Sequence, residues 1–215
     1  MASLAVVIAA FAVPVLTVEP TAPQAAEVVP RQDVRVAVVG DSLSAGRSGF
    51  LGNGLDDESW MTYAKGDGIA FAGGWARAGA TPDEMAAAVE PIENVDVLVI
   101  LAGTNAVRTG RTFADERPAY ERIVDTIGAR QVIVAGLPPY RWKPTEAVEY
   151  SRALQQFVVQ EGWRWADPWT FARSGSSWAN GVSTDGTHPA DAAEYRRLGL
   201  AFRSIILSVV AASPS

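Results

Sequence analysis

The stretch VRVAVVGDS, Val34 to Ser42, passes from a nearly continuous apolar run into a glycine followed by two short polar residues. Short, valine-rich runs of this kind are typical of strands buried on both faces. A glycine with Asp and Ser after it suits a tight strand-to-helix turn. The stretch therefore predicts a buried strand over Val34–Val39 with polar side chains at its carboxyl end.

Similar strand patterns follow along the chain and alternate with helical segments. Helix starts are marked by capping residues and by prolines at the first helical position. This alternation predicts an α/β fold, an open parallel sheet with helices on both faces. The expected strands are Val34–Val39, Ile69–Gly73, Val95–Leu101, Gln131–Gly136 and Arg164–Ala166, and the expected helices run from Thr81 to about Val89, Thr112 to Ile127, Pro144 to Gln160, and near Pro189 to Val210.

Composition narrows the classes of function. A chain of 215 residues that is 48% hydrophobic is long enough for one sizeable core, so we expect one folded domain. The formal net charge of −6, from 24 acids and 18 bases, argues against a nucleic-acid partner. The absence of cysteine and the single histidine argue against a thiolate nucleophile and a zinc site. We expect neither a metal nor a cofactor.

The N-terminal residues are expected to lie outside this domain. Leu4–Leu16 is a 13-residue apolar run, the length of the apolar part of a secretory signal, and Thr17–Pro30 is rich in Pro and Ala. We interpret residues 1–30 as a signal peptide or anchor with a linker, and residues 31–215 as the domain. The chain is then exported, with cleavage near Ala25 or Ala26, although an uncleaved anchor or a misassigned start codon fits as well.

A second apolar stretch lies near the C-terminus. Leu198–Ala212 is interrupted by Arg203. A charge within such a run favours an amphipathic helix over a membrane span. We therefore expect no stable membrane span in the mature domain.

Ligands of open α/β sheets bind outside the carboxyl ends of the strands. Ser42 follows the first predicted strand there, and Asn105 follows the third. The only histidine, His188, lies in a late irregular segment that can reach the same edge. Histidine can take and return a proton near neutral pH. Each residue alone also fits a structural role, as a cap or a turn.

Three common nucleotide and hydrolase motifs are missing. No G-x-G-x-x-G follows the first strand, and neither G-x-x-x-x-G-K-[ST] nor G-x-S-x-G occurs. A dinucleotide site is therefore disfavoured, and Ser42 lies in a different turn from the α/β-hydrolase elbow.

Four short blocks follow one another along the chain: Gly40-Asp41-Ser42-Leu43-Ser44, Gly79, Gly103-Thr104-Asn105 and Asp185-Gly186-Thr187-His188-Pro189. In this order they resemble the blocks of the SGNH hydrolases, also called the GDSL esterase and lipase family. Gly79 matches the second block, although Gly73 and Gly74 are nearby alternatives. Ala106 stands where this family usually has an aspartate after the third-block asparagine.

The resemblance implies a flavodoxin-like three-layer fold with a central parallel sheet flanked by helices. It also implies a Ser-His-Asp triad: Ser42 as nucleophile, His188 as general base and Asp185 as the carboxylate that orients the imidazole. The oxyanion hole would be the backbone N–H groups of Ser42 and Gly79 and the side-chain amide of Asn105. Asp41, next to Ser42, is expected to brace the turn.

The implied activity is hydrolysis of a small acyl ester through an acyl-enzyme, with an acetylated carbohydrate or a lipid ester as substrate. Five of the seven tryptophans lie between Trp142 and Trp178, where they either stack on sugar rings or pack the domain's own loops. Arg141 and Arg173 either recognise an anionic substrate or are solvated. Two alternatives stay open: a catalytically silent carbohydrate or cell-wall binding module, and an acyltransferase.

Overall fold

The computed structural model describes residue 1 and residues 32–212, so the predicted signal and linker lie outside the described residues except for Met1. Five strands form one sheet in the order β2-β1-β3-β4-β5, and every neighbouring pair is parallel. This is the strand order of flavodoxin-like folds. The strands are β1 (Val34–Gly40), β2 (Ile69–Ala76), β3 (Val97–Leu101), β4 (Gln131–Ala135) and β5 (Arg164–Ala166).

All five predicted strands are present, with shifted ends. β2 continues three residues past the predicted Gly73, because residues 73–76 pair with β1 after a bulge. β3 begins at Val97 instead of Val95, because a left-handed residue, Asn94 with φ 57°, turns the chain just before it. The Asp96 carboxylate then accepts the Arg35 N–H at 2.9 Å.

The four long helices are α3 (Pro82–Ala88), α5 (Phe113–Ile127), α6 (Pro144–Gln160) and α7 (Ala192–Ala211). Capping boxes at Thr81 and Thr112 start α3 and α5 as the sequence indicates. The predicted start of the last helix near Pro189 is wrong. Asp191 caps α7 by accepting the N–H groups of Ala193 and Glu194, so the chain up to residue 190 stays a loop.

Several short elements were not predicted, because segments of about five residues or fewer are too short to show the 3.6-residue period of a helix. They include three single-turn helices, a 3₁₀ turn and a two-stranded hairpin. These are α1 (Ser42–Ala45), η1 (Leu51–Asn53), α2 (Met61–Ala64), α4 (Thr104–Arg108), β6 (Arg173–Ser174) and β7 (Ser177–Trp178).

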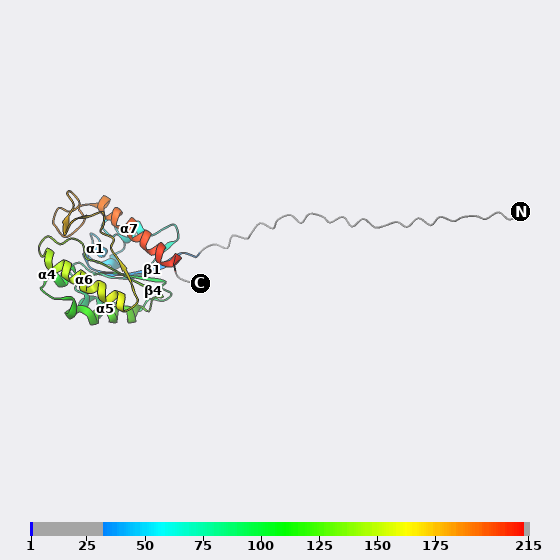
Figure 1. The fold of residues 1–215 in the computed structure, drawn as a ribbon, viewed down its shortest axis with the longest axis horizontal. Helices are drawn as coiled ribbons and strands as arrows, with labels where there is room; N and C mark the ends of the chain where they lie inside the picture. The colour runs from blue at the N-terminus through cyan, green and yellow to red at the C-terminus, as the bar shows by residue number, and fades with distance from the viewer. Residues whose placement is uncertain (2–31, 213–215) are drawn as a thin grey trace. The chain divides into compact units, whose positions relative to one another are not determined.

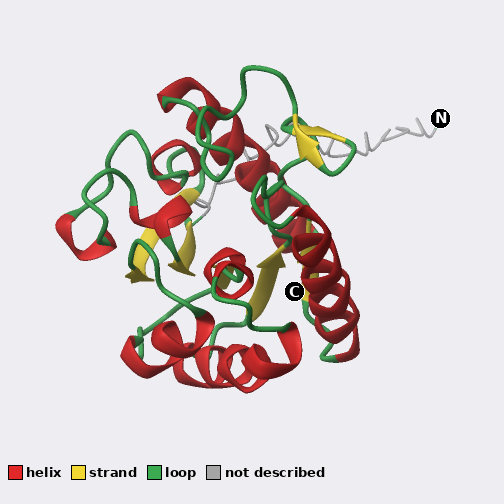
Figure 2. Cartoon of the chain, turned by 90° about the vertical axis from the view of Figure 1, so that its left-hand side faces the viewer, coloured by secondary structure: helices red, strands yellow, loops and turns green. Residues whose placement is uncertain are grey.

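The sheet separates two apolar cores. Along β1, Val36 and Val38 face one core, while Ala37 and Val39 face the other, as a strand of period two requires. Helices α1, α2 and α7 cover the first face, and α3, α5 and α6 cover the second. Figure 1 shows α7 on one side of β1 and β4 with α5 and α6 on the other, and Figure 2 shows helices on both sides of the strands. The three-layer prediction is confirmed.

The stretch Leu198–Ala212 falls within and just after α7, whose buried residues include Leu198, Phe202 and Ile206. It is therefore an amphipathic helix on the sheet, as expected. Gly199 allows α7 to approach α2 closely, since a Cβ there would lie 2.4 Å from the Trp60 carbonyl oxygen. None of the helices within residues 32–212 is long and apolar enough to cross a bilayer.

The chain runs from β1 to β2 on one side of it, and then from β2 back past β1 to β3 on its other side. This is a topological switch point, where open α/β sheets hold their ligands. Ser42 follows β1 and Asn105 follows β3, so both lie at this point.

Candidate active site

Ser42 is the first residue of α1, directly beyond the carboxyl end of β1. The turn is fixed by Asp41, whose Oδ1 accepts the Leu43 N–H at 3.1 Å. Gly40 makes it tight, because a Cβ there would lie 2.8 Å from the Leu101 carbonyl oxygen of β3. Asp41 therefore braces the turn, as the sequence suggests, and Ser42 remains partly exposed at the sheet edge.

His188 reaches Ser42 across 146 positions of sequence. Its Nε2 lies 2.8 Å from Ser42 Oγ, and its Nδ1 lies 2.7 Å from Asp185 Oδ2. An ionised carboxylate can only accept, so Nδ1 carries the ring proton and Nε2 is left to accept the Ser42 hydroxyl proton. The three predicted residues thus form one continuous hydrogen-bonded chain.

The loop that carries Asp185 and His188 is held by Asp185 itself. Asp185 Oδ1 accepts the backbone N–H of Thr187 at 2.7 Å and of His188 at 2.8 Å. Burial raises the pKa of Asp185, but the His188 ring and these N–H groups lower it more, so the net pKa lies below the usual value. Asp185 is therefore ionised at neutral pH.

Arg141 fastens the same loop from outside. Its N–H donates to the Gly186 carbonyl oxygen at 3.0 Å, and its Nη2 donates to the Thr184 carbonyl oxygen at 3.3 Å. Its side chain fills the space beside Gly186, where a Cβ would lie 2.5 Å from Arg141 Cβ. Arg141 thus serves the loop structurally, a role that its sequence context did not indicate.

Asn105 is held in one orientation by three partners. Its Oδ1 accepts Arg108 Nε at 3.0 Å, and its Nδ2 donates to the Ala80 carbonyl oxygen at 3.1 Å. A longer contact of 3.4 Å joins Nδ2 to Asp41 Oδ2, leaving the second amide hydrogen weakly engaged. Ala106, in the place of the usual aspartate, is buried in the core on the α5 and α6 side of the sheet.

Gly79 lies in the turn between β2 and α3 with φ 81°. The space around it is open, since a Cβ at this position would have no heavy atom within 4 Å apart from its chain neighbours. No hydrogen bond among the described residues uses the N–H of Gly79 or of Ser42. Gly73 and Gly74 lie within β2, where Gly74 packs against the Val38 carbonyl, so they are strand glycines.

A pocket of about 330 Å³ brings these groups together. Four of the five predicted site residues line it, while Asp185 lies behind the His188 ring. The lining residues are Asp41, Ser42, Leu43, Ala78, Gly79, Thr104, Asn105, Arg108, Tyr140, Trp142, Thr187 and His188.

The model of the GDSL-like lipase/acylhydrolase family matches residues 38–195, most of the chain. The chain belongs to this family. It is therefore a GDSL-type ester hydrolase, as the sequence blocks indicate.

Solved structures of several esterases and lipolytic proteins share the fold of this chain. A carbohydrate acetylesterase family member from Sinorhizobium meliloti has a TM-score of 0.62 at 16% identity, covering 82% of this chain and 99% of that one. A G-D-S-L lipolytic protein from Veillonella parvula has 0.62 at 13%, covering 80% and 98%. A carbohydrate esterase family 3 protein from Talaromyces cellulolyticus has 0.56 at 15%, covering 84% and 100%. Comparison with curated protein sequences found no match.

The GDSL blocks did not reveal every residue of this pocket. Arg108, Tyr140 and Trp142 line it as well. Arg108 follows Asn105 by three residues in α4, which places both on one helix face. The contact was not predicted, because this short helix was not predicted. Tyr140 and Trp142 come from the loop after β4, whose path only the structure gives.

Asp41 is a buried acid next to Ser42. Burial raises its pKa to about 6, although the Leu43 hydrogen bond and the nearby His188 lower it. The carboxylate is therefore mostly ionised at neutral pH, at a cost in folding free energy.

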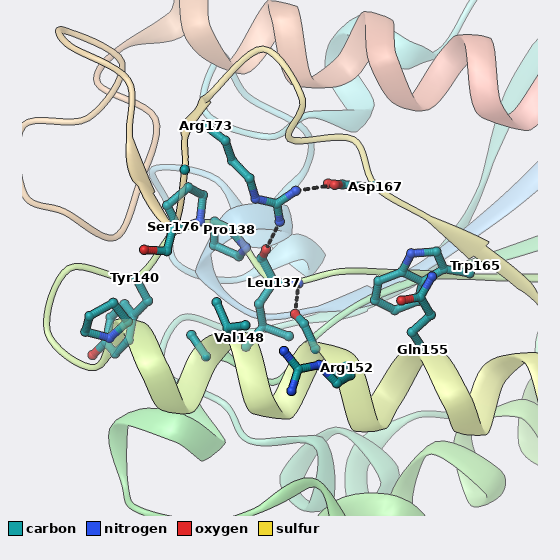
Figure 3. Close-up of a pocket in the computed structure, with 15 residues that line it drawn as sticks. Leu137, Pro138, Tyr140, Val148, Arg152, Gln155, Trp165, Asp167, Arg173 and Ser176 are labelled. Carbon is teal, nitrogen blue, oxygen red and sulfur yellow. Dashed lines mark hydrogen bonds and ion pairs between the residues drawn. The ribbon is translucent and has the colours of Figure 1, made fainter.

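A second pocket of about 370 Å³ adjoins the GDSL site, with Tyr140 lining both. Figure 3 shows Arg173 above it, ion-paired with Asp167 and donating to the Leu137 carbonyl oxygen. Arg173 is thus engaged by the protein itself, and not simply solvated.

Proposed function

We propose that the protein hydrolyses carboxylic esters through an acyl-enzyme on Ser42. The observation that carries this proposal is the hydrogen-bonded chain from Asp185 through His188 to Ser42, with 2.7 Å and 2.8 Å between the partner atoms. A serine hydroxyl becomes a good nucleophile only when a base lies within such reach. A catalytically silent binding module has no use for this arrangement.

In the first half of the reaction, Ser42 Oγ attacks the ester carbonyl carbon while His188 Nε2 takes the hydroxyl proton. Asp185, ionised and bonded to Nδ1, stabilises the imidazolium that forms. The tetrahedral intermediate then collapses: the carbon–oxygen bond to the alcohol breaks, and His188 returns its proton to the leaving alcohol oxygen. The acyl group is left on Ser42.

Negative charge on the carbonyl oxygen is stabilised by three donors in this proposal: the Ser42 and Gly79 N–H groups and the Asn105 amide. The two N–H groups have no competing acceptor among the described residues, which supports the assignment. Each such donor is typically worth about 3–4 kcal/mol in the transition state. Arg108 and Ala80 fix which end of the Asn105 amide faces the pocket.

Water completes the cycle. It attacks the acyl carbon while His188 takes one of its protons, the bond to Ser42 Oγ breaks, and the proton returns to the serine. The products are a carboxylic acid, which releases its proton to the solvent at neutral pH, and the free alcohol, and the triad is restored.

A short acyl group is the best-supported substrate. The pocket, at about 330 Å³, lies near the lower end of the range of small-molecule sites. Proteins that share the fold include an acetyl esterase solved with acetate and a carbohydrate acetylesterase family member. We therefore propose acetyl or similarly short esters in preference to long-chain lipid esters.

Export remains part of the proposal. Its support is the sequence alone, the apolar run Leu4–Leu16 and the Pro/Ala-rich segment Thr17–Pro30. An exported esterase would meet its ester substrate outside the cytoplasm.

The test uses p-nitrophenyl acetate, butyrate and octanoate with the wild-type protein and with Ser42→Ala. Hydrolysis should be fastest for acetate, decline with chain length, and vanish in the variant while its melting temperature is retained. Wild-type activity that survives in Ser42→Ala would rule out the serine mechanism, and a preference for octanoate would rule out the short-acyl substrate.

A further inference from the structure

Trp142 differs from the other tryptophans in its part of the chain. Trp169 is fully buried with Nε1 bonded to the Gly136 carbonyl, Trp178 packs on Trp169 with centroids 5.8 Å apart, and Trp163 packs on Phe157. Trp142 is 63% exposed. Packing against the protein's own residues therefore explains the positions of these three tryptophan rings, but not that of Trp142.

The exposed ring lies at the proposed catalytic pocket. Trp142 lines the same pocket as Ser42 and His188. It belongs to the short segment between the loop after β4 and the start of α6. Aromatic side chains that line a pocket are typical ligand contacts.

The ring also contacts Arg141, the residue that holds the loop of Asp185 and His188. The Arg141 guanidinium carbon lies 5.8 Å from the Trp142 ring centroid, within cation–π range. Arg141 is in turn bonded to the carbonyl oxygens of Thr184 and Gly186, on the loop of Asp185 and His188. A ring held in this way forms a preformed surface for a ligand.

The residues near the Trp142 ring indicate which kind of ligand fits there. Arg141 precedes it in the chain, and Arg108 lines the same pocket. Arg108 uses Nε on Asn105, while its terminal nitrogens bond no acceptor in the described part of the chain. An aromatic plane beside free guanidinium donors suits a molecule with one apolar face and oxygen atoms around its edge.

A sugar ring has this chemistry, since its axial C–H bonds form an apolar face and its hydroxyl and ester oxygens accept hydrogen bonds. A long acyl chain lacks such an edge of oxygen atoms. We propose that Trp142 stacks against the sugar ring that forms the alcohol half of the ester, with the short acyl group directed to Ser42. This inference rests on the proposed esterase function and names its substrate class.

The kinetic test compares three acetates: methyl 2,3,4-tri-O-acetyl-β-xylopyranoside, glycerol triacetate, which has no ring, and phenyl acetate. Trp142→Ala should lower kcat/KM for the xyloside about five- to tenfold, mainly through KM, the size expected for one lost aromatic contact. Its activity on glycerol triacetate should stay within about twofold of the wild type. Trp142→Phe keeps a ring and should restore most of the loss on the xyloside.

Val159→Ala is the matched control, because Val159 is 65% exposed and lies near the end of α6, outside the lining of the catalytic pocket. It should leave all three activities unchanged. Equal losses of Trp142→Ala on the xyloside and glycerol triacetate would show a structural role and overturn the proposal. So would an unchanged xyloside activity, or a loss confined to phenyl acetate.

A binding measurement separates this inference from the esterase proposal. In saturation-transfer NMR, the Ser42→Ala protein should transfer magnetisation to the ring C–H protons of the xyloside, and Ser42→Ala/Trp142→Ala should not. If this holds while the wild type hydrolyses no acetate, the sugar surface stands and the esterase proposal fails. If acetates are hydrolysed but Ser42→Ala shows no transfer that depends on Trp142, the esterase stands and the sugar surface is wrong.

Discussion

Asp41 is the residue whose role the sequence motif states least clearly. It lies beside the proposed nucleophile, and its carboxylate accepts the Leu43 N–H and lies 3.4 Å from the Asn105 amide nitrogen. It is also 1% exposed, with a pKa raised to about 6. The protein therefore maintains a buried acid that links the Ser42 turn to Asn105.

Replacing this acid should change how stability depends on pH. Because the folded pKa lies above the usual value of 3.8, the folded state holds the proton more tightly than the unfolded state. The wild type should lose stability as the pH rises from about 4 to 6, by about 3 kcal/mol at most, whereas Asp41→Asn should not. Melting temperatures at pH 4.5 and 7.5 test this. The melting temperature of Asp41→Asn minus that of the wild type should be higher at pH 7.5 than at pH 4.5. An identical difference at both values would contradict the assigned pKa.

Asp185→Asn should reduce kcat about 10³- to 10⁴-fold, since an amide facing His188 Nδ1 favours the wrong tautomer. Its remaining oxygen can still accept the N–H groups of Thr187 and His188, so the loop should keep its shape. Steady-state kinetics and circular dichroism provide the check. A variant with near wild-type kcat would remove Asp185 from the triad.

At the level of single residues, the sequence identifies the proposed catalytic side chains but not the side chains that hold them in position. Ser42, His188 and Asn105 stand in recognisable blocks, and the Asp185 spacing allows it to fold back on the imidazole. Arg141 and Arg173 gave no such signal. Their bonds go to carbonyl oxygens 43 and 36 positions away, contacts that depend on how the loops cross.

At the level of elements, the loop before α7 contains two glycines whose backbone conformations disfavour any other residue. Gly186 has φ 78° and no room for a Cβ beside Arg141. Gly181 has φ 81° and open space around it. Substitution of Gly181 therefore tests backbone strain alone, whereas substitution of Gly186 adds a steric clash with Arg141.

Gly181→Ala should lose about 1–2 kcal/mol of stability from left-handed strain alone and keep its activity. Gly186→Ala should lose more, and its kcat should fall at least about tenfold because the loop of Asp185 and His188 must move. Chemical denaturation and steady-state kinetics measure both. Equal effects of the two substitutions on kcat would show that the contact with Arg141 does not position the triad.

The long elements were predictable because each carries its own signal. β1, β3 and β4 are valine-rich runs, and α3 and α5 open with capping boxes. The single-turn helices α1 and α4 were not, because they arise from the turns that follow β1 and β3. The start of α7 was misplaced for a related reason: Pro189 resembles a first helical residue, but Asp191 supplies the cap.

In the molecule as a whole, both cores and all proposed site residues lie between Val34 and Val210. A protein of residues 31–215 should therefore match the full chain in melting temperature and in kcat/KM. The control ends at Arg197 and lacks the buried Leu198, Phe202, Ile206 and Val209. At roughly 1.5–3 kcal/mol for each lost side chain, it should not fold. Loss of the cooperative transition in residues 31–215 would place part of the fold in the N-terminal segment.

The most direct test of the central claim is covalent labelling by an organophosphate, followed by peptide mass spectrometry. One diethylphosphoryl group per chain is expected, on the peptide that contains Ser42, with esterase activity lost in proportion to labelling. Ser42→Ala should take up none, and His188→Ala should react far more slowly, because the hydroxyl then has no base. A label on another residue, or full activity in fully labelled protein, would rule out Ser42 as the nucleophile.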